Sequence, residues 1–307
     1  MRWQKLGRLF VPDGSIPWMH SHATLPTAVH LNGDEFRVYF SSRDPEGRSH
    51  VGYADVDVCK GLWTGGISEQ PIISPGPLGR FDYSGATISW VVERDETEYF
   101  YYVGWNLAIE VPFRNALGLV IRNRINNNQL RKLPGPVLDR SPVDPCFVAA
   151  ASILVDGSLW RMWYLSCTEW EINGDQLRHK YHIKYAESTD GIWWSRDGRI
   201  CIDFADDSEY AISRPSVVRD KDGYHMWYSW RGEKYRIGYA SSSDGLSWTR
   251  RDREAGISVS PGQWDGDMIE YPFVFDHAGR RYMLYNGDGY GLSGFGLAVL
   301  EDYSPDS

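Results

Sequence analysis

The chain of 307 residues has little cysteine, and what it has forms no recognisable motif. None of the four cysteines belongs to a Cys-x-x-Cys pair or stands at a metal-ligand spacing from histidine; they are Cys59, Cys146, Cys167 and Cys201. This pattern argues against a disulfide-stapled secreted scaffold and offers no zinc motif. We therefore expect free, mostly buried thiols, with no metal and no cofactor.

The chain also lacks an excess of positive charge and a long apolar run. Its formal net charge is -9, whereas nucleic acids and anionic membrane surfaces are bound by positive faces. No stretch approaches the roughly 18 apolar residues of a membrane span, and the N-terminal segment has only a short apolar patch at residues 9–11. We expect no nucleic-acid partner, no membrane insertion, no signal peptide and a cytoplasmic location.

Helical periodicity and phosphate-binding loops are missing as well. The segment "GDGYGLSGFG" (287–296) is rich in glycine. It has neither the strand-then-helix context nor the downstream acidic residue of a dinucleotide site, so we reject that interpretation. Aromatic residues, in contrast, are abundant, with 14 Trp and 19 Tyr. They suit a β-rich core or a surface on which sugars stack.

The chain repeats itself. "HIKYAESTDGIWWSRDG" (182–198) and "RIGYASSSDGLSWTRRD" (236–252) are close copies, preceded by "RMWYLSC" (161–167) and "HMWYSWR" (225–231). Asp-Gly between alternating apolar residues indicates a tight turn between strands. Weaker copies start at Arg37, Tyr99 and Tyr282.

Five aromatic residues align in these copies at intervals near sixty residues: Phe40, Tyr102, Tyr164, Tyr228 and Tyr285. Such a period holds four short strands, which predicts an all-β, five-bladed β-propeller of mostly four-stranded antiparallel blades around a central channel. We expect one domain over residues 1–307, with blades near 20–58, 81–124, 143–198, 208–252 and 265–301. In the pairs Trp163–Tyr164 and Trp227–Tyr228, at least one member should be buried between blades.

Each unit opens with a strand rich in small residues, and three of these strands contain an aligned proline (Pro26, Pro215 and Pro272). In a propeller the entry ends of such strands converge on one mouth of the channel. Ionisable residues recur near these entries, and a second set follows the aromatic strands. The expected catalytic carboxylates are Glu270, Asp144, Asp82 and Glu209, and the expected substrate-binding residues are His22, Arg43, Trp105, Asn106, Arg114, Arg214, Arg231, Asp267, Tyr271 and Asn286.

Paired carboxylates near aromatics and arginines are what glycosidic chemistry requires. A protonated carboxyl donates a proton to the leaving oxygen, and an ionised one activates water or attacks the sugar. The acid must be desolvated or lie beside another carboxylate to stay protonated. We expect Glu270 to be this acid, close to Asp144 or Asp82, with Glu209 as the alternative.

With "DP" at Asp144 and "E-x-P" at Glu270, the five units resemble the five-bladed propeller glycosidases, a superfamily that includes arabinanases, xylosidases, invertases, levanases and mannoside phosphorylases. "SHATLP", "YVGWN", "SEYAISRP" and "WDGDMIEYP" look closer to an uncharacterised branch met beside bacterial surface-polysaccharide genes. The resemblance implies that Glu270 is similar to the general acid and Asp144 to the aspartate that tunes it. The first-unit aspartate of those enzymes is replaced here by "HSHATLP", with His20 and His22.

The resemblance leaves several functions open. A glycoside hydrolase acting on an oligosaccharide or sugar conjugate is the first. A phosphorylase that uses phosphate, or a sugar transferase, would need only one carboxyl acid and a cationic anion site, for which His22, Arg43, Arg214 and Arg231 are candidates. A non-catalytic sugar-binding propeller is the third, because a fold does not determine a function.

Overall fold

The computed structural model describes residues 1–125, 128–301 and 303. Twenty β-strands make up its regular structure, and the only helical element among the described residues is the short 3-10 helix η1 (Asp252–Glu254). None of the described segments is a helix long and apolar enough to cross a membrane. The all-β prediction is confirmed.

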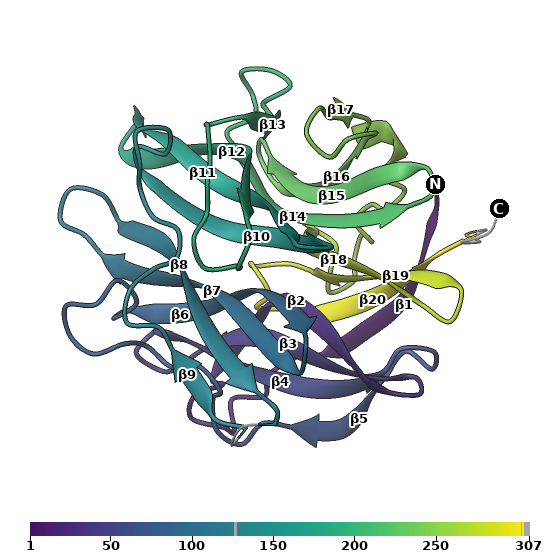
Figure 1. The fold of residues 1–307 in the computed structure, drawn as a ribbon. Coiled ribbons are helices and arrows are strands. Elements are labelled where there is room, and N and C mark those ends of the chain that lie inside the picture. Colours follow the sequence, from purple (N-terminus) through teal and green to yellow (C-terminus); the bar gives the residue numbers. More distant parts are fainter. Residues whose placement is uncertain (126–127, 302, 304–307) are drawn as a thin grey trace.

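One eight-stranded sheet contains the strands between Ser21 and Lys132 (Figure 1). Two antiparallel four-strand groups form it, and a single parallel bridge from Ser49 to Gly85 joins them. The first group is β2 (Ser21–Asn32), β3 (Glu35–Arg43), β4 (Ser49–Asp57) and β5 (Leu62–Ile67). The second group is β6 (Gly85–Arg94), β7 (Thr97–Leu107), β8 (Phe113–Asn123) and β9 (Leu130–Lys132).

The second eight-stranded sheet is built in the same way. A single parallel bridge from Tyr181 to Ala211 joins its two antiparallel groups. The third group is β10 (Phe147–Asp156), β11 (Leu159–Asn173), β12 (Gln176–Ser188) and β13 (Ile200–Ile202). The fourth group is β14 (Ala211–Asp220), β15 (Gly223–Arg231), β16 (Tyr235–Ser242) and β17 (Thr249–Arg250).

The fifth group combines the two ends of the described chain. Its strands are β18 (Glu270–His277), β19 (Arg280–Asn286), β20 (Phe295–Leu300) and β1 (Trp3–Phe10), in the order β1-β20-β19-β18. Figure 1 shows β1 beside β20, and the two strands pair antiparallel from Trp3↔Leu300 to Phe10↔Phe295. The repeat pattern did not predict a strand in residues 3–10.

The opening strands β2, β14 and β18 each contain a bulge at the aligned proline. The residue before the proline has a positive φ in each case: 54° at Leu25, 48° at Arg214 and 56° at Tyr271. The strand register shifts around these residues. Bulges bend a strand and redirect its side chains, and left-handed backbone at non-glycine residues is costly and concentrates at functional or packing sites. These three side chains are therefore directed by strained backbone.

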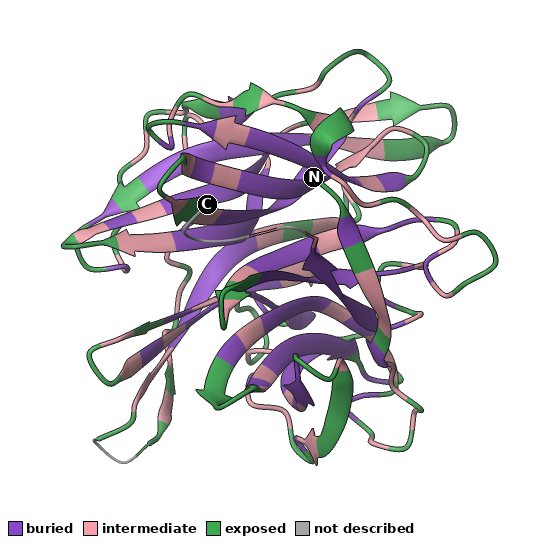
Figure 2. Ribbon diagram, turned by 90° about the vertical axis from the view of Figure 1, so that its right-hand side faces the viewer, coloured by how far each residue is buried: buried purple, intermediate pink, exposed green. Residues whose placement is uncertain are grey.

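The core runs through all the strand groups, with burial greatest along the middle of the strands and exposure at the turns (Figure 2). Trp163, Tyr164, Trp227 and Tyr228 are all fully buried, which confirms the expected burial of the aromatic pairs. Gly118 shows how close this packing is, because a Cβ there would lie 2.3 Å from the Tyr102 ring.

Four of the five aligned aromatics make the same polar contact. Their hydroxyls donate hydrogen bonds of 2.5–3.2 Å to aspartates, and each aspartate also pairs with a lysine or arginine. In chain order the contacts are Tyr102–Asp82–Lys132, Tyr164–Asp144–Arg196, Tyr228–Asp252–Arg250 and Tyr285–Asp265–Lys5. We call this the Tyr–Asp–cation contact; Phe40, in the first group, has no hydroxyl with which to make it.

Candidate active site

All five strand groups contribute to the wall of one cavity of about 420 Å³. This size lies within the range of about 300–1,000 Å³ that is usual for small-molecule sites. The lining residues are Thr24, Leu25, Ser41, Ser42, Arg43, Ser49, Thr87, Val103, Trp105, Phe113, Asn115, Phe147, Ala149, Ala150, Leu165, His179, Tyr181, Ser213, Arg231, Tyr235, Tyr271 and Tyr290. Hydroxyl groups and aromatic rings dominate this wall, which matches the hydroxyls and the apolar ring faces of a sugar.

The described lining carries positive charge and no carboxylate. Its charged residues are Arg43, from the first group, and Arg231, from the fourth. Burial, and then the charge of Arg231, lower the pKa of His179 to about 4. His179 is therefore neutral near pH 7, and the two arginines supply the charge.

Arg231 lies among tyrosines. Its guanidinium carbon is 5.3 Å from the ring centroids of Tyr210 and Tyr235 and 5.8 Å from that of Tyr290. Cation–π attraction holds a guanidinium over such rings. Its Nε has no hydrogen-bond partner among the described residues.

Glu270 lies immediately behind this part of the wall. It is fully buried, and neither carboxylate oxygen makes a hydrogen bond of good geometry with a described residue. The side chain of Tyr271 and the backbone of Tyr290 nevertheless lie close enough to lower the pKa of Glu270, though by less than burial raises it. Burial raises the pKa of Glu270 well above its ordinary value, and Arg231 counteracts this rise only in part. An unpaired buried carboxylate is costly, so the group takes up a proton instead. Burial, rather than the expected neighbouring carboxylate, is therefore the main cause that favours the protonated form of Glu270.

At the β18 bulge, Tyr271 lines the cavity while its neighbour Glu270 does not. Tyr271, the next residue, has the left-handed conformation and lines the cavity, while its backbone N–H donates to Ser229 Oγ at 2.7 Å. The charge of Glu270 contributes to raising the pKa values of both Tyr271 and Tyr235, after burial, which is the main cause. Two tyrosines of the cavity wall therefore lie next to the buried acid.

The other three expected catalytic carboxylates do not line the cavity. Asp144 and Asp82 belong to Tyr–Asp–cation contacts, and Asp144 also accepts from Ser166 Oγ at 2.6 Å. Glu209 forms a two-pronged ion pair with Arg250, at 2.7 and 2.9 Å. Asp82 and Asp144 recur at similar places in the sequence repeat because the Tyr–Asp–cation contact recurs in the strand groups.

The expected substrate-binding residues divide into two sets. Arg43, Trp105, Arg231 and Tyr271 line the cavity, and Trp105 Nε1 donates to Ser49 Oγ at 2.7 Å. The others are not part of its wall: His22, Asn106, Arg114, Arg214, Asp267 and Asn286. Burial, followed by the charge of Arg43, lowers the pKa of His22 to about 4, and the exposed Asp267 pairs with Lys234.

Arg214 and Asn286 lie in the packed interior and connect strand groups. Arg214 is fully buried and donates to backbone oxygens of Ser89 and Pro26 and to Thr27 Oγ1, so it joins the fourth group to the second and first. Burial lowers the pKa of Arg214 to about 9. Asn286 accepts from Leu25 N and donates to Ala23 O, which joins the fifth group to the first.

Sequence reasoning missed several residues of the wall, including His179, Tyr181, Tyr235 and Tyr290. Tyr290 lies in the glycine-rich segment that we rejected as a dinucleotide loop. Gly291 has a φ of 90°, and its carbonyl accepts from Ala23 N, so the segment folds against β2 and places Tyr290 at the cavity. The cluster of glycines around one aromatic was the feature that could have identified it.

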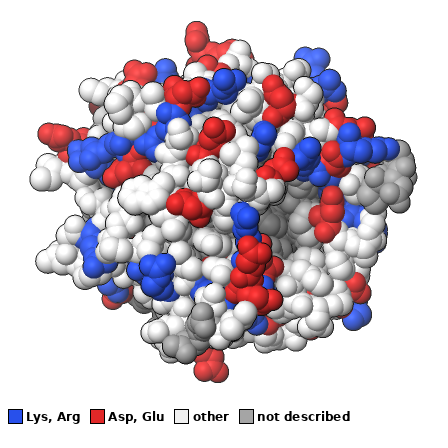
Figure 3. All heavy atoms as spheres, viewed as in Figure 1, with Lys and Arg blue, Asp and Glu red and all other residues white. Residues whose placement is uncertain are grey.

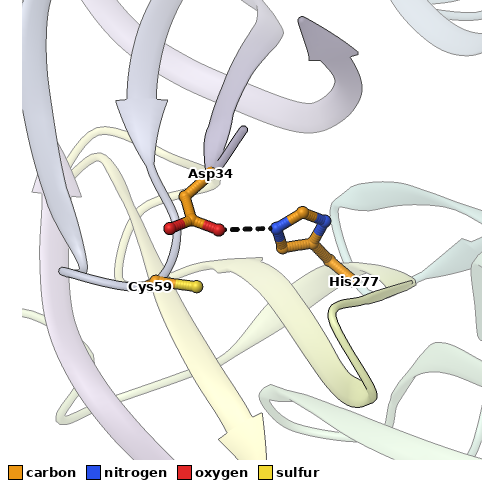
Figure 4. Close-up of side chains that lie close together, drawn as sticks. All are labelled: Asp34, Cys59 and His277. Carbon is orange, nitrogen blue, oxygen red and sulfur yellow. Dashed lines mark hydrogen bonds and ion pairs between the residues drawn. The ribbon is translucent and has the colours of Figure 1, made fainter. Parts of the chain in front are cut away.

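One group of possible metal ligands lies away from the cavity lining. Potential ligand atoms of Asp34, Cys59 and His277 lie within 4.8 Å of one another (Figure 4). Asp34 and Cys59 are exposed, and His277 Nε2 is 2.9 Å from Asp34 Oδ1. This hydrogen bond accounts for the contact between the aspartate and the histidine without an ion.

The face of the molecule seen in Figure 1 has mixed charge. Figure 3 shows acidic and basic side chains interspersed over the face seen in Figure 1, without a broad area of one sign. The two arginines of the cavity are therefore a local feature of the site.

Comparison with solved structures identifies the fold. A structure from the GH130 family of mannoside phosphorylases, which contains hydrolases that target β-1,2 mannosidic linkages in Candida mannan, superposes with a TM-score of 0.73 at 14% identity, covering 99% of this chain and 94% of the other. The catalytic domain of the Coprinopsis cinerea GH62 α-L-arabinofuranosidase gives 0.68 at 13% identity, with 98% of each chain covered. A thermostable family-43 glycoside hydrolase gives 0.64 at 16% identity, covering 91% and 88%. The chain has the fold of the propeller glycosidases, as the sequence resemblance predicted.

Sequence comparison places the chain within a narrower group. It is 45% identical over 302 residues to uncharacterized proteins MT1551 and Rv1502 of Mycobacterium tuberculosis, covering 98% of this chain and all of each relative. The chain belongs to the family of these two mycobacterial proteins. No protein-family model matches it.

Proposed function

We propose that the five four-strand groups are the five blades of one propeller domain and that the protein is a glycoside-active enzyme. The supporting architecture is the cavity to which every group contributes. A propeller brings residues from distant parts of the chain to one mouth of its channel, and sites between repeated units are common places for ligands.

The observation that carries the enzymatic proposal is the buried Glu270. A binding protein gains nothing from a fully buried carboxyl whose burial is so incompletely compensated, and such a group lowers stability. A glycosidase needs a carboxyl that stays protonated near neutral pH. Glu270 meets this requirement beside a wall of aromatic rings and hydroxyls.

In this proposal Glu270 supplies the proton for the leaving oxygen. Because Tyr271 and Tyr235 stand between it and the cavity, we propose that the proton travels through the Tyr271 hydroxyl, which takes one from Glu270 as it gives one to the sugar. Arg231, the nearest source of positive charge to Glu270 in the wall, then stabilises the carboxylate that remains. The rings of Trp105 and Tyr290 would hold the sugar ring.

The nucleophile separates two versions of the function. Ordinary hydrolysis uses a second carboxylate to activate water or attack the sugar, and the described cavity lining contains none. This observation favours phosphorolysis as a second candidate, because phosphate is itself the nucleophile and arginines bind it. We assign no base residue, and the dependence of turnover on phosphate decides between the two candidates.

The test is a screen of aryl glycosides and oligosaccharides, with and without phosphate, using the wild type and Glu270→Gln. Gln keeps the size of the side chain but cannot donate the proton. We expect Glu270→Gln to abolish turnover of natural glycosides while sparing activated aryl glycosides, whose leaving groups need no proton.

Glu209→Gln serves as the comparison. It makes the same change at a different buried acid, one that forms an ion pair with Arg250. Full activity of Glu270→Gln on a natural substrate would contradict the assignment, and loss of activity in Glu209→Gln alone would move the acid to Glu209. Sugar binding without cleavage of any glycoside would favour a binding module.

A further inference from the structure

The positive charges of the cavity form no direct ion pair among the described residues, and the carboxyl that Arg231 acts on, Glu270, lies buried behind the wall with its pKa raised by burial. Neither Arg43 nor Arg231 forms an ion pair with any described residue, and no described residue of the lining is acidic. This occurs in a chain with a net charge of -9. Carboxylates are plentiful elsewhere, so the composition does not account for the absence of a partner.

Other arginines that are at least half-buried show the contrast. Arg37 pairs with Asp55, Arg122 with Glu98, and Arg250 with Glu209. Arg214 has no acidic partner, but its guanidinium donates to three protein oxygens. Arg231, in contrast, donates no side-chain hydrogen bond to any described residue, and its guanidinium is surrounded by aromatic rings.

The position of Arg231 suits recognition of an anion. Rings of Tyr210, Tyr235 and Tyr290 restrict the guanidinium, which reduces the entropy that it would lose on binding. A planar guanidinium matches the two oxygens of a carboxylate, sulfate or phosphate group, and such bonds are stronger than bonds to neutral hydroxyls.

We propose that the sugar bound in this cavity carries an anionic group, a carboxylate, sulfate or phosphate ester, that pairs with Arg231, while Arg43 contributes to the attraction from the first strand group. This inference rests on the proposed function in one respect, namely that the ligand is a sugar. It differs from phosphorolysis because the anion belongs to the sugar and is not a separate reactant.

The size and the wall of the cavity favour an anion that is part of a larger ligand. A volume of about 420 Å³ holds much more than one inorganic ion. Trp105, Phe113 and Phe147 add apolar ring surface, which an inorganic ion does not use. The wall therefore combines arginines that can bind an anionic group with aromatic side chains that can pack against a sugar ring.

The experiment measures binding by calorimetry at low and high salt. The ligands are glucuronic and galacturonic acid, a sulfated hexose and a hexose phosphate, with glucose and galactose as neutral counterparts and inorganic phosphate as the free anion. We expect one of the anionic sugars to bind at least about tenfold more tightly than its neutral counterpart, with the advantage decreasing as salt is added.

Variants locate the effect. Arg231→Met should weaken binding of the anionic sugar by about tenfold or more, and Arg43→Met should weaken it less, because Arg43 is exposed. Arg253→Met removes an exposed arginine of η1 that is not in the cavity wall, and should change nothing. Circular dichroism and melting temperature establish that each variant is folded.

The outcomes separate this inference from the proposed function. Equal binding of neutral and anionic sugars, or binding of inorganic phosphate alone, would overturn the inference, whether or not glycosides are cleaved. Selective binding of an anionic sugar by a protein that cleaves no glycoside would uphold the inference and reject the enzymatic function.

Discussion

The Tyr164 hydroxyl donates a hydrogen bond of 3.2 Å to the Asp144 carboxylate, and both side chains are fully buried. Asp144 also pairs with Arg196 at 2.7 Å. The hydrogen-bonding capacity of the Asp144 carboxylate is thus taken up inside the protein, which suits a role in packing. Glu270 differs, because burial outweighs the effect of its neighbours Tyr271 and Tyr290 and raises its pKa.

Removal of the Asp144 carboxylate should destabilise the fold. Asp144→Ala leaves the charges of Arg196 and Lys184 in a buried site without compensation, which costs about 3–5 kcal/mol. Tyr164→Phe removes only one hydrogen bond and should cost about 1 kcal/mol. Urea denaturation measures both changes, with Tyr99→Phe as a control at a hydroxyl that bonds to no described residue. A loss below about 1 kcal/mol in Asp144→Ala would rule out the packing role.

Stability should depend on pH through Glu270 in an unusual direction. Its pKa is raised in the folded state, so the folded protein holds the proton more tightly than the unfolded chain does. The stabilisation is complete below the unfolded pKa, near 4.5, and decreases as pH rises above that value. Glu270→Gln removes this decrease, so the melting temperature of the variant relative to the wild type should rise from pH 4.5 to pH 8. A constant difference over this range would contradict a raised pKa.

His179 should make the protein less stable as the pH falls below 6.5, whereas the contribution of Glu270 decreases as the pH rises. Its pKa is lowered to about 4, so the unfolded chain binds a proton between pH 6.5 and pH 4 that the folded protein does not. The contribution of His179 to stability is present above pH 6.5 and is lost as pH falls through this window. His179→Gln should therefore lose less stability than the wild type on going from pH 7 to pH 4. Parallel stability curves for the two proteins would show that His179 titrates normally.

Arg214 should matter for stability and not for the charge of the cavity. Arg214→Ala removes a fully buried side chain and three hydrogen bonds to other strand groups, and should cost about 3–5 kcal/mol, as for other large buried side chains. Arg219→Ala, on the same strand, removes an exposed ion pair with Asp156 and should cost about 1 kcal/mol or less. Chemical denaturation distinguishes the two. Equal stability of both variants would show that Arg214 does not hold the groups together.

The repeat made most of the fold predictable from the sequence. The aligned aromatics report a regular chemical pattern, and all five lie on strands: Phe40 on β3, Tyr102 on β7, Tyr164 on β11, Tyr228 on β15 and Tyr285 on β19. Strand β1 could not be found in this way, because residues 3–10 match no part of the repeat and pair with residues nearly 300 positions away.

The site was less predictable, for a physical reason. A carboxylate that recurs in every unit can serve packing as well as chemistry, and Asp82 and Asp144 lie in recurring packing contacts. Conversely, His179 and Tyr181 reach the cavity because β12 extends along its wall, with their rings stacked at 4.6 Å. The direction in which a strand presents each side chain depends on bulges and neighbouring groups, which one sequence does not specify.

The pairing of β1 with β20 also has a consequence for the order of events during synthesis. β1 is the earliest described strand to leave the ribosome, yet its partner emerges only after residue 295, so its edge stays open while almost everything else is translated. An open strand edge is a place where chains associate wrongly. The fifth group, which supplies Tyr271 and Tyr290 to the cavity, is therefore the last to be completed. The wall of the cavity would therefore be complete only when β1 and β20 meet.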